Sequence, residues 1–263
     1  MVKRNRFIGA RDILDQLDAV NVSETTIRSR IKESGEFKSY WACKKPFISP
    51  KNRKKRLAWA QEHLDWSPEQ WMRVLWTDES PFVLVFNRRK RVWRLHNERY
   101  DPKCTIATVK HDKKINVWGC FAAHGVGDLY LVEGKLEQKQ FKRILERHML
   151  PSAERLFPDE DWIFQQDNDP KHTARSIQEW IGSQDIECFN WPAQSPDLNP
   201  IENLWSILDA KLSKRRPQNE QQLFEVLQEG WANLDVEMLT RLVCSLPDRC
   251  RAVIKAKGYP TKF

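Results

Sequence analysis

Apolar and polar positions after residue 72 first follow the pattern of short strands. Apolar runs of strand-like composition occupy residues 73–77, 82–86, 115–121 and 129–132. Turn-forming residues separate the first two runs, in the sequence DESP at 78–81, and the sequence GVG at 125–127 separates the last two. Strands with such local connections pair antiparallel. The pattern predicts hairpins that open a mixed sheet, with the chain reversing at 78–81.

The spacing changes in the second half of the chain. Helical spacing at 138–150, 171–181 and 199–212 alternates with strand-like runs at 162–166 and 186–191. Alternation of this kind builds layered α/β folds with helices on both faces of the sheet. The expected fold class is therefore α/β, with a mixed sheet flanked by helices.

Two short amphipathic helices are expected near the amino terminus, at 10–17 and 25–31. Ser23 is a suitable N-cap for the second helix, which carries Arg28, Arg30 and Lys32. The pair fits the back half of a DNA-binding helix-turn-helix, and it fits a surface helical hairpin equally well.

Positive charge is concentrated in the same quarter of the chain. Residues 1–60 contain 15 Lys and Arg against 6 Asp and Glu, which leaves a net charge of −1 for residues 61–263. Clustered basic residues bind phosphates, so this asymmetry indicates an arm that binds a polyanion, with a solvated tail as the alternative. The densest run fits a nuclear localisation segment, a DNA-backbone contact or a solvated linker, and its basic residues are Lys51, Arg53, Lys54, Lys55 and Arg56.

Composition narrows the class of protein further. Hydrophobic residues make up 40% of the chain and include 12 Trp, which is enough to bury a sizeable core. The six cysteines form no Cys-x-x-Cys pair and no zinc-finger spacing. Neither a membrane-length apolar stretch nor a signal-peptide pattern is present in the sequence. We expect a soluble intracellular protein.

Three carboxylates are the candidate chemical groups. Asp78 and Asp167 each stand where a strand-like run stops, and Glu202 stands one turn into a helix, at the edge of its apolar stripe. Ligand sites gather at the carboxyl ends of sheet strands. Three hard oxygen ligands suit Mg²⁺ or Mn²⁺, and two such ions about 4 Å apart promote displacement at a phosphodiester.

Each carboxylate also has a structural interpretation. Asp78 could be a turn residue. Near Asp167, the helix N-cap role fits Asp169 better, because Pro170 follows it. Glu202 could complete a capping box with Asn199.

Three sequence blocks decide between these interpretations: LWTDES at 75–80, FQQDNDPKHTA at 164–174 and WPAQSPDLNPIENLW at 191–205. Together they resemble the signature blocks of the mariner superfamily of DNA transposases, in the Tc-type branch. In this chain 34 residues lie between Asp167 and Glu202, which is the spacing between the second and third acidic residues in that branch. The sequences VKH at 109–111, VWGCF at 117–121 and KGYPTKF at 257–263 are similar to this branch as well.

The resemblance implies an RNase H-like catalytic domain at 71–263, after a partial helix-turn-helix at 1–38 and a basic linker and helix at 39–70. It implies that Asp78, Asp167 and Glu202 bind two Mg²⁺ ions, for which Mn²⁺ can substitute. Members of the family act in the nucleus, as oligomers on double-stranded DNA. They cut at transposon inverted repeats and join the freed ends to TA target sites.

The chain also departs from the family pattern. It begins after the first helix-turn-helix, so an amino-terminally truncated member is expected, and its glycine-rich box is thinned at 111–114. An inactive or domesticated DNA-binding relic is the alternative function. His172 is expected to cap a helix or contact phosphate rather than transfer a proton. Of the tryptophans, Trp41 is the candidate for base stacking, and Trp118, Trp180, Trp205 and Trp231 are expected in the core.

Overall fold

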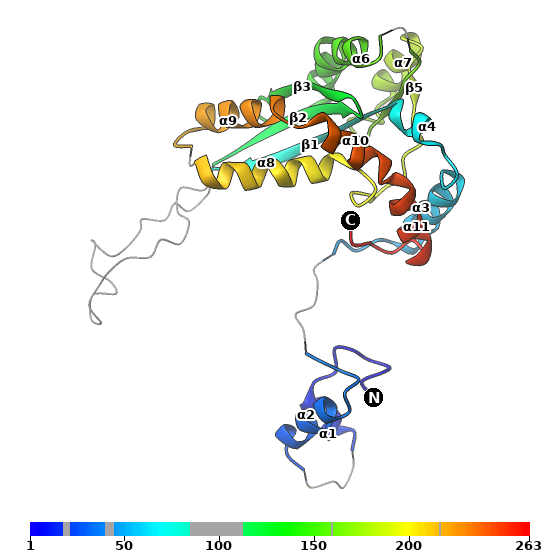
Figure 1. The fold of residues 1–263 in the computed structure, drawn as a ribbon, viewed down its shortest axis with the longest axis vertical. Helices are drawn as coiled ribbons and strands as arrows, with labels where there is room; N and C mark the ends of the chain where they lie inside the picture. Colours follow the sequence, from blue (N-terminus) through cyan, green and yellow to red (C-terminus); the bar gives the residue numbers. More distant parts are fainter. Residues whose placement is uncertain (18–21, 40–44, 85–112, 159, 216) are drawn as a thin grey trace, which may run out of the picture. The chain divides into compact units, whose positions relative to one another are not determined.

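The computed structural model describes residues 1–17, 22–39, 45–84, 113–158, 160–215 and 217–263. The chain divides into two compact units, Met1–Lys45 and Pro46–Phe263 (Figure 1). The segment predicted as linker, 39–70, therefore belongs to the larger unit from Pro46 onward. Trp41, the VKH sequence at 109–111 and the first half of the thinned glycine-rich box, 111–112, lie outside the described residues.

The smaller unit contains the two predicted helices. These are α1 (Ala10–Asp15) and α2 (Glu24–Glu33), which contact each other. Ser23 caps α2 as expected, because its side chain accepts a hydrogen bond from the Thr26 N–H at 3.2 Å. Of the two helices, only α1 has a buried residue, Ile13.

The larger unit is built on a mixed sheet in the order β3-β2-β1-β4-β5. The first three strands in chain order pair antiparallel, and β1, β4 and β5 pair parallel, as the sequence predicts. Their bounds are β1 Val74–Val83, β2 Lys114–Ala122, β3 Gly125–Val132, β4 Ile163–Gln165 and β5 Glu187–Cys188.

The turn predicted at 78–81 is wrong, because β1 is one continuous strand through these residues. It pairs with β2 from Trp76↔Phe121 to Val83↔Lys114. Beyond Trp76 no residue of β4 pairs with β1, so among the described residues this part of β1 has no partner strand on that edge, where Pro81 is tolerated. The return strand predicted at 82–86 is the end of the same strand, as far as it is described.

Helices cover both faces of the sheet, as expected. Val117 and Phe121 of β2 share a hydrophobic core with one group of helices, and Trp118 and Cys120 share a second core with the other group. Figure 1 shows α8, α9 and α10 on one side and α6 and α7 on the other. The first group is α3 (Pro50–Glu62), α4 (Pro68–Met72), α8 (Ile201–Arg215), α9 (Glu220–Ala232), α10 (Val236–Cys244) and α11 (Leu246–Lys255). The second is α5 (Gln138–Ile144), the π-helix η2 (Leu145–Met149), α6 (Leu150–Leu156) and α7 (Arg175–Ser183).

Several predicted elements end at different residues. The helix predicted at 138–150 continues to Leu156, and the π-helical turn η2 directly before Pro151 is the kind of local adjustment that accommodates a proline. α7 begins at Arg175 rather than 171, so Asp169 does not cap it. Instead Asp169 forms a turn, accepting the Lys171 N–H on its side chain at 3.0 Å. The strand predicted at 186–191 is reduced to the two residues of β5.

The basic run at 51–56 also differs from its prediction. It forms the first turns of α3 instead of leading into a helix, because Ser49 caps the helix at 3.2 Å from the Asn52 N–H and Pro50 occupies its first turn.

Candidate active site

Asp78 and Asp167 lie at the same level of the sheet, on neighbouring parallel strands. β1 and β4 pair with each other up to Trp76 and Gln165. Asp78 follows Trp76 by two positions, and Asp167 follows Gln165 by two positions. Thr77 fastens the strands at this point. Its N–H donates to Gln165 Oε1 at 3.1 Å, and its hydroxyl donates to the Gln165 carbonyl at 2.8 Å. The strand pairing thus brings together two side chains that are far apart in sequence.

Glu202 comes from the first turn of α8. Asn199 precedes this helix, and its Oδ1 accepts the Ile201 N–H at 3.3 Å. The Asn199 amide also donates to Asp78 Oδ2 at 3.3 Å, which links the start of α8 to β1. The Glu202 carboxylate has no hydrogen-bond partner in the part of the chain that the structure describes. The capping-box interpretation of Glu202 is therefore not supported.

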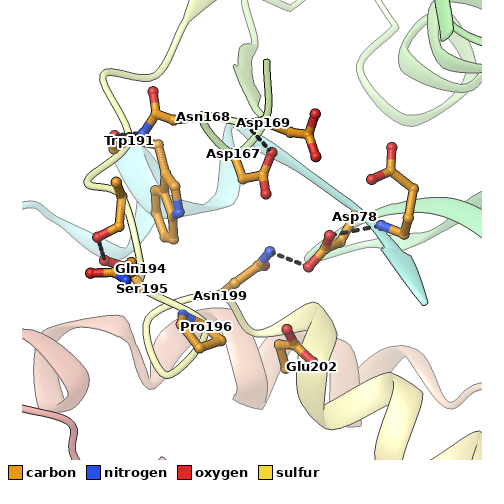
Figure 2. A pocket seen from close by; sticks show the side chains of 12 residues that line it. Asp78, Asp167, Asn168, Asp169, Trp191, Gln194, Ser195, Pro196, Asn199 and Glu202 are labelled. Atoms are coloured by element: carbon orange, nitrogen blue, oxygen red, sulfur yellow. Dashed lines mark hydrogen bonds between the residues drawn. The ribbon is translucent and has the colours of Figure 1, made fainter. Parts of the chain in front are cut away.

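The three carboxylates line one pocket of about 380 Å³. Figure 2 shows Asp78, Asp167 and Glu202 around this pocket, on different sides of it, with Asn199 between them. The three carboxylates singled out in the sequence therefore line the same pocket. The remaining lining residues are Glu79, Asn168, Asp169, Trp191, Ala193, Gln194, Ser195, Pro196 and Asn199.

Negative charge is poorly compensated on one side of the pocket. Burial and, next, the charge of Glu202 raise the pKa of Asp78 well above its usual value, although the Glu79 N–H donates to Asp78 Oδ1 at 2.7 Å and opposes this shift. Burial also raises the pKa of Glu202. Both carboxylates are therefore more costly to hold in charged form than exposed ones.

Asp167 has a compensating cation, His172. Burial alone would raise the pKa of Asp167, but the hydrogen bond from His172 Nδ1 at 2.6 Å and the charge of that ring lower it. His172 Nε2 contacts Glu79 Oε1 at 3.0 Å. Burial opposes the imidazolium form, yet these two carboxylates raise the pKa of His172 to about 9.

His172 was expected to cap a helix or contact phosphate, and the structure contradicts this. Its side chain is only 4% exposed, and both ring nitrogens already contact carboxylates. α7 begins three residues later, with Ala174 at its N-cap. His172 instead joins Asp167 to Glu79. Glu79 was not among the residues predicted from the sequence, although its position beside Asp78 was a signal. It also pairs with Lys171 at 3.2 Å.

The chemistry of the pocket fits a divalent cation. Carboxylate oxygens are the donors that Mg²⁺ and Mn²⁺ prefer. Burial raises the pKa of both Asp78 and Glu202, and the charge of Glu202 adds to the shift of Asp78, so a bound cation would offset the cost of holding these groups charged. Within the described residues, no group of three or more Asp, Glu, His and Cys side chains is arranged to hold a metal ion as it stands. The side chains would have to close around the ion.

Most of the predicted DNA-binding residues are exposed. In the smaller unit this holds for Arg28, Arg30 and Lys32, although the two arginines pair with Glu24 and Glu33 of their own helix. In the larger unit, Lys51, Lys54 and Lys55 are exposed on α3, and Arg53 is half-buried with its guanidinium 4.0 Å above the Tyr259 ring.

Arg56 is the exception and corrects the prediction. Its side chain is fully buried, and its guanidinium forms a bidentate ion pair with Asp197 in which both hydrogen bonds are 2.8 Å long. A side chain in this position cannot reach a DNA phosphate. Arg56 shares the buried stripe of α3 with Trp59, Ala60 and His63.

The tryptophans are part of the core, as expected. Trp118, Trp205 and Trp231 are buried, and Trp180 is half-buried against the second core. Trp191 is buried among other aromatic rings and contributes to the pocket wall.

The sheet order, with helices on both faces, is that of an RNase H-like fold, and two aspartates and one glutamate line one pocket on it. Residues 73–224 match the family described as DDE superfamily endonuclease, and residues 1–65 match a family described as a transposase. The chain is 41% identical over 244 residues to the Tcb1 transposase of Caenorhabditis briggsae, covering 92% of this chain and 88% of that one. It is 39% identical to the Tc1 transposase of Caenorhabditis elegans, with the same coverage. The chain belongs to the Tc1/mariner family of transposases.

Solved structures agree on the fold. A Mos1 transposase paired-end complex with the left transposon end has a TM-score of 0.81 and is 20% identical, covering 99% of this chain and 77% of that one. This confirms the mixed sheet flanked by helices and the helical DNA-binding region. The protein is thus an enzyme that acts on DNA as a transposase. No helix within the described ranges is long and apolar enough to span a membrane.

Proposed function

We propose that the protein excises a transposon by metal-dependent cleavage of DNA at inverted repeats and joins the freed 3′ ends to a TA target site. Asp78, Asp167 and Glu202 would hold two Mg²⁺ ions, for which Mn²⁺ can substitute. The observation that carries this proposal is the single pocket lined by all three carboxylates. A Mos1 paired-end complex with Mn and another with Mg support the choice of metals.

The residues around the carboxylates would orient them. Asn199 and the Glu79 N–H hold the two oxygens of Asp78, and His172 holds one oxygen of Asp167. When bound, divalent cations activate the attacking oxygen and neutralise charge on the scissile phosphate. His172 has both ring nitrogens engaged, so it serves to position Asp167 rather than to accept a proton from the nucleophile.

DNA binding is assigned to the exposed basic residues of both units. These are Arg28, Arg30 and Lys32 on α2, and Lys51, Lys54, Lys55 and the half-buried Arg53 on α3. Their charge suits the phosphate backbone and not the acidic pocket. The protein would act as an oligomer on paired ends, as the Mos1 paired-end structures suggest, and in the nucleus, where the genomic DNA of its host lies.

Cleavage of a labelled inverted-repeat duplex in Mg²⁺ or Mn²⁺ tests the proposal. We expect the wild-type protein to cut and Asp167→Asn to lose cleavage while it keeps its fold and DNA affinity. Asp161→Asn is the matched control, since its carboxylate is 97% exposed and lies outside this pocket. Cleavage by Asp167→Asn would refute the assignment. Binding without cleavage by the wild type would support the inactive relic, which the three retained carboxylates disfavour.

A further inference from the structure

A buried ion pair lies behind one wall of the catalytic pocket. Arg56 of α3 is 0% exposed and Asp197 is 8% exposed. Two parallel hydrogen bonds of 2.8 Å join the guanidinium to the carboxylate. A bidentate pair of this kind, between opposite charges, is among the strongest and most directional contacts that side chains make. Neither residue lines the pocket itself.

The same pair gathers the end of the chain onto this wall. The Thr261 N–H and hydroxyl each donate to Asp197 Oδ2 at 2.9 Å, and Arg56 Nε donates to the Gly258 carbonyl at 3.1 Å. Arg249 of α11 donates to the Asp197 carbonyl at 3.0 Å. Asp197 is thus held through its side chain and its backbone by three segments that are remote in sequence.

Arg56 also holds the pocket wall through a second residue, Gln194. It donates to the Gln194 carbonyl at 3.0 Å, and Asn52, one turn earlier on α3, donates to Gln194 Oε1 at 2.9 Å. Gln194 has a φ of 59°, a left-handed conformation that is rare for residues other than glycine. Such backbone strain persists only where surrounding contacts enforce it.

The segment held in this way leads directly to the carboxylates. Gln194, Ser195 and Pro196 line the pocket, as Figure 2 shows. Asn199 follows Asp197 by two residues and donates to Asp78, and Glu202 stands in the first turn of the next helix, α8. Arg249 additionally donates to Asn203 Oδ1 at 2.6 Å, beside Glu202. A shift at Asp197 would therefore move two things together: Asn199, which donates a hydrogen bond to Asp78, and the start of α8, which carries Glu202.

We propose that Arg56 and Asp197 are positioning residues for DNA cleavage, which lock the wall at 194–199 so that Asn199 and Glu202 stand in their working places. The inference rests on the proposed function, since it concerns the same pocket. It assigns the buried end of the basic run a role in catalysis instead of in DNA binding. Small displacements in an active site are costly, and a shift of about 1 Å can reduce a rate about a hundredfold.

Single-turnover cleavage of a saturating inverted-repeat duplex, together with hydrogen exchange over 191–203, tests this role. In Asp197→Asn we expect the cleavage rate to fall about a hundredfold, DNA affinity to stay within about threefold because the exposed lysines remain, and exchange over 191–203 to increase. Thr261→Val removes the hydroxyl that donates to Asp197 and keeps the shape of the side chain. It should disturb folding less than Asp197→Asn and show a smaller fall in the cleavage rate.

The double variant Arg56→Met/Asp197→Leu separates positioning from folding. Replacing both charges by apolar side chains leaves no buried unpaired charge, so the fold is retained while the bonds to Gln194 and Thr261 are lost. We expect cleavage to stay low in this variant. Two controls complete the design. Asp128→Asn makes the same change at a carboxylate of β3 that pairs with Arg155 of α6, and Met149→Ala weakens the core on the other face. Both should cut at the wild-type rate at a temperature where they are folded.

The outcomes are distinct. Wild-type cleavage rates in the double variant or in Thr261→Val would overturn the positioning role, as would a rate loss of equal size in Met149→Ala. If the wild-type protein failed to cut at all, the proposed function would fail instead. The hydrogen-exchange comparison would then still decide whether Asp197 fixes the wall, because unchanged exchange in all variants overturns that claim independently of activity.

Discussion

Replacing Asp78 by Asn should separate the stability of the protein from its response to metal. Asp78 is buried, and burial and Glu202 raise its pKa, so its charge opposes folding in the absence of a cation. The Asn side chain has nearly the same shape and carries no charge. Without metal, we therefore expect the melting temperature of Asp78→Asn to be no lower than that of the wild type. With Mn²⁺, only the wild type should gain stability.

The size of that gain follows from mass action and from the size of the unit that holds the site. Free Mn²⁺ at about 100 times its dissociation constant stabilises a native protein by about 2.7 kcal/mol, provided that it does not bind the unfolded chain. The larger unit contains about 220 residues, for which 1 kcal/mol shifts the melting temperature by about 2–4 °C. We expect a rise of about 5–10 °C in the wild type.

Tryptophan fluorescence during thermal unfolding is the appropriate assay. Trp71, Trp76 and Trp118 are buried in the larger unit, so their emission reports its unfolding. Ca²⁺ and Mn²⁺ titrations of the wild type and of Asp161→Asn serve as controls. A Mn²⁺ shift of equal size in Asp78→Asn would refute the assignment of Asp78 as a ligand. A metal-free melting temperature several degrees below that of the wild type would refute the electrostatic reasoning.

Three further predictions concern the surface, the pH dependence and the backbone. Lys54→Ala should reduce the slope of log affinity against log salt by about 0.9, as for one lost phosphate contact, in fluorescence anisotropy with duplex DNA; an unchanged slope would contradict its role. Burial opposes the charged form of Asp197, but Arg56 and Thr261 lower its pKa. The stability that the charged carboxylate contributes is therefore present above the usual pKa of an aspartate, and it is lost as the pH falls through the lowered pKa. Urea unfolding of Asp197→Asn should therefore show a weaker loss of stability with acid than the wild type, and parallel curves would contradict this. Gly258→Ala should cost about 2–3 kcal/mol in the same assay, because Gly258 has a φ of 79° and a Cβ there would lie 2.2 Å from the Arg53 carbonyl oxygen; a loss below about 0.5 kcal/mol would contradict it.

The convergence of the carboxylates could be predicted from the sequence even though one local element could not. Asp78 and Asp167 both follow apolar runs of strand-like composition, which was enough to expect them near each other on one sheet, although Asp78 lies within β1 and not at its end. The predicted turn at 78–81 failed because β2 provides a partner for these residues, and no local pattern in the chain contains that pairing. The strand continues past Asp78 for a reason that lies more than thirty residues away.

Arg56 shows the second limit of sequence reasoning. In a run of basic residues nothing marks one of them as buried, and its partner Asp197 is 141 residues away. A weaker signal was present: Arg56 precedes Trp59 and Ala60 by three and four residues, which puts it on the apolar face of a helix. Periodicity can therefore indicate that a charged residue faces the core, but only the tertiary structure identifies its partner.

The contacts of residues 258–261 have a consequence for how such genes lose function. Gly258 and Thr261 hold the segment that carries Asp197, so the codons for 258–261 specify part of the pocket wall. A premature stop codon there would leave all three acidic residues encoded, together with the blocks at 75–80, 164–174 and 191–205. Such a copy would still look intact by these three blocks, yet its product would lack the anchor of the pocket wall.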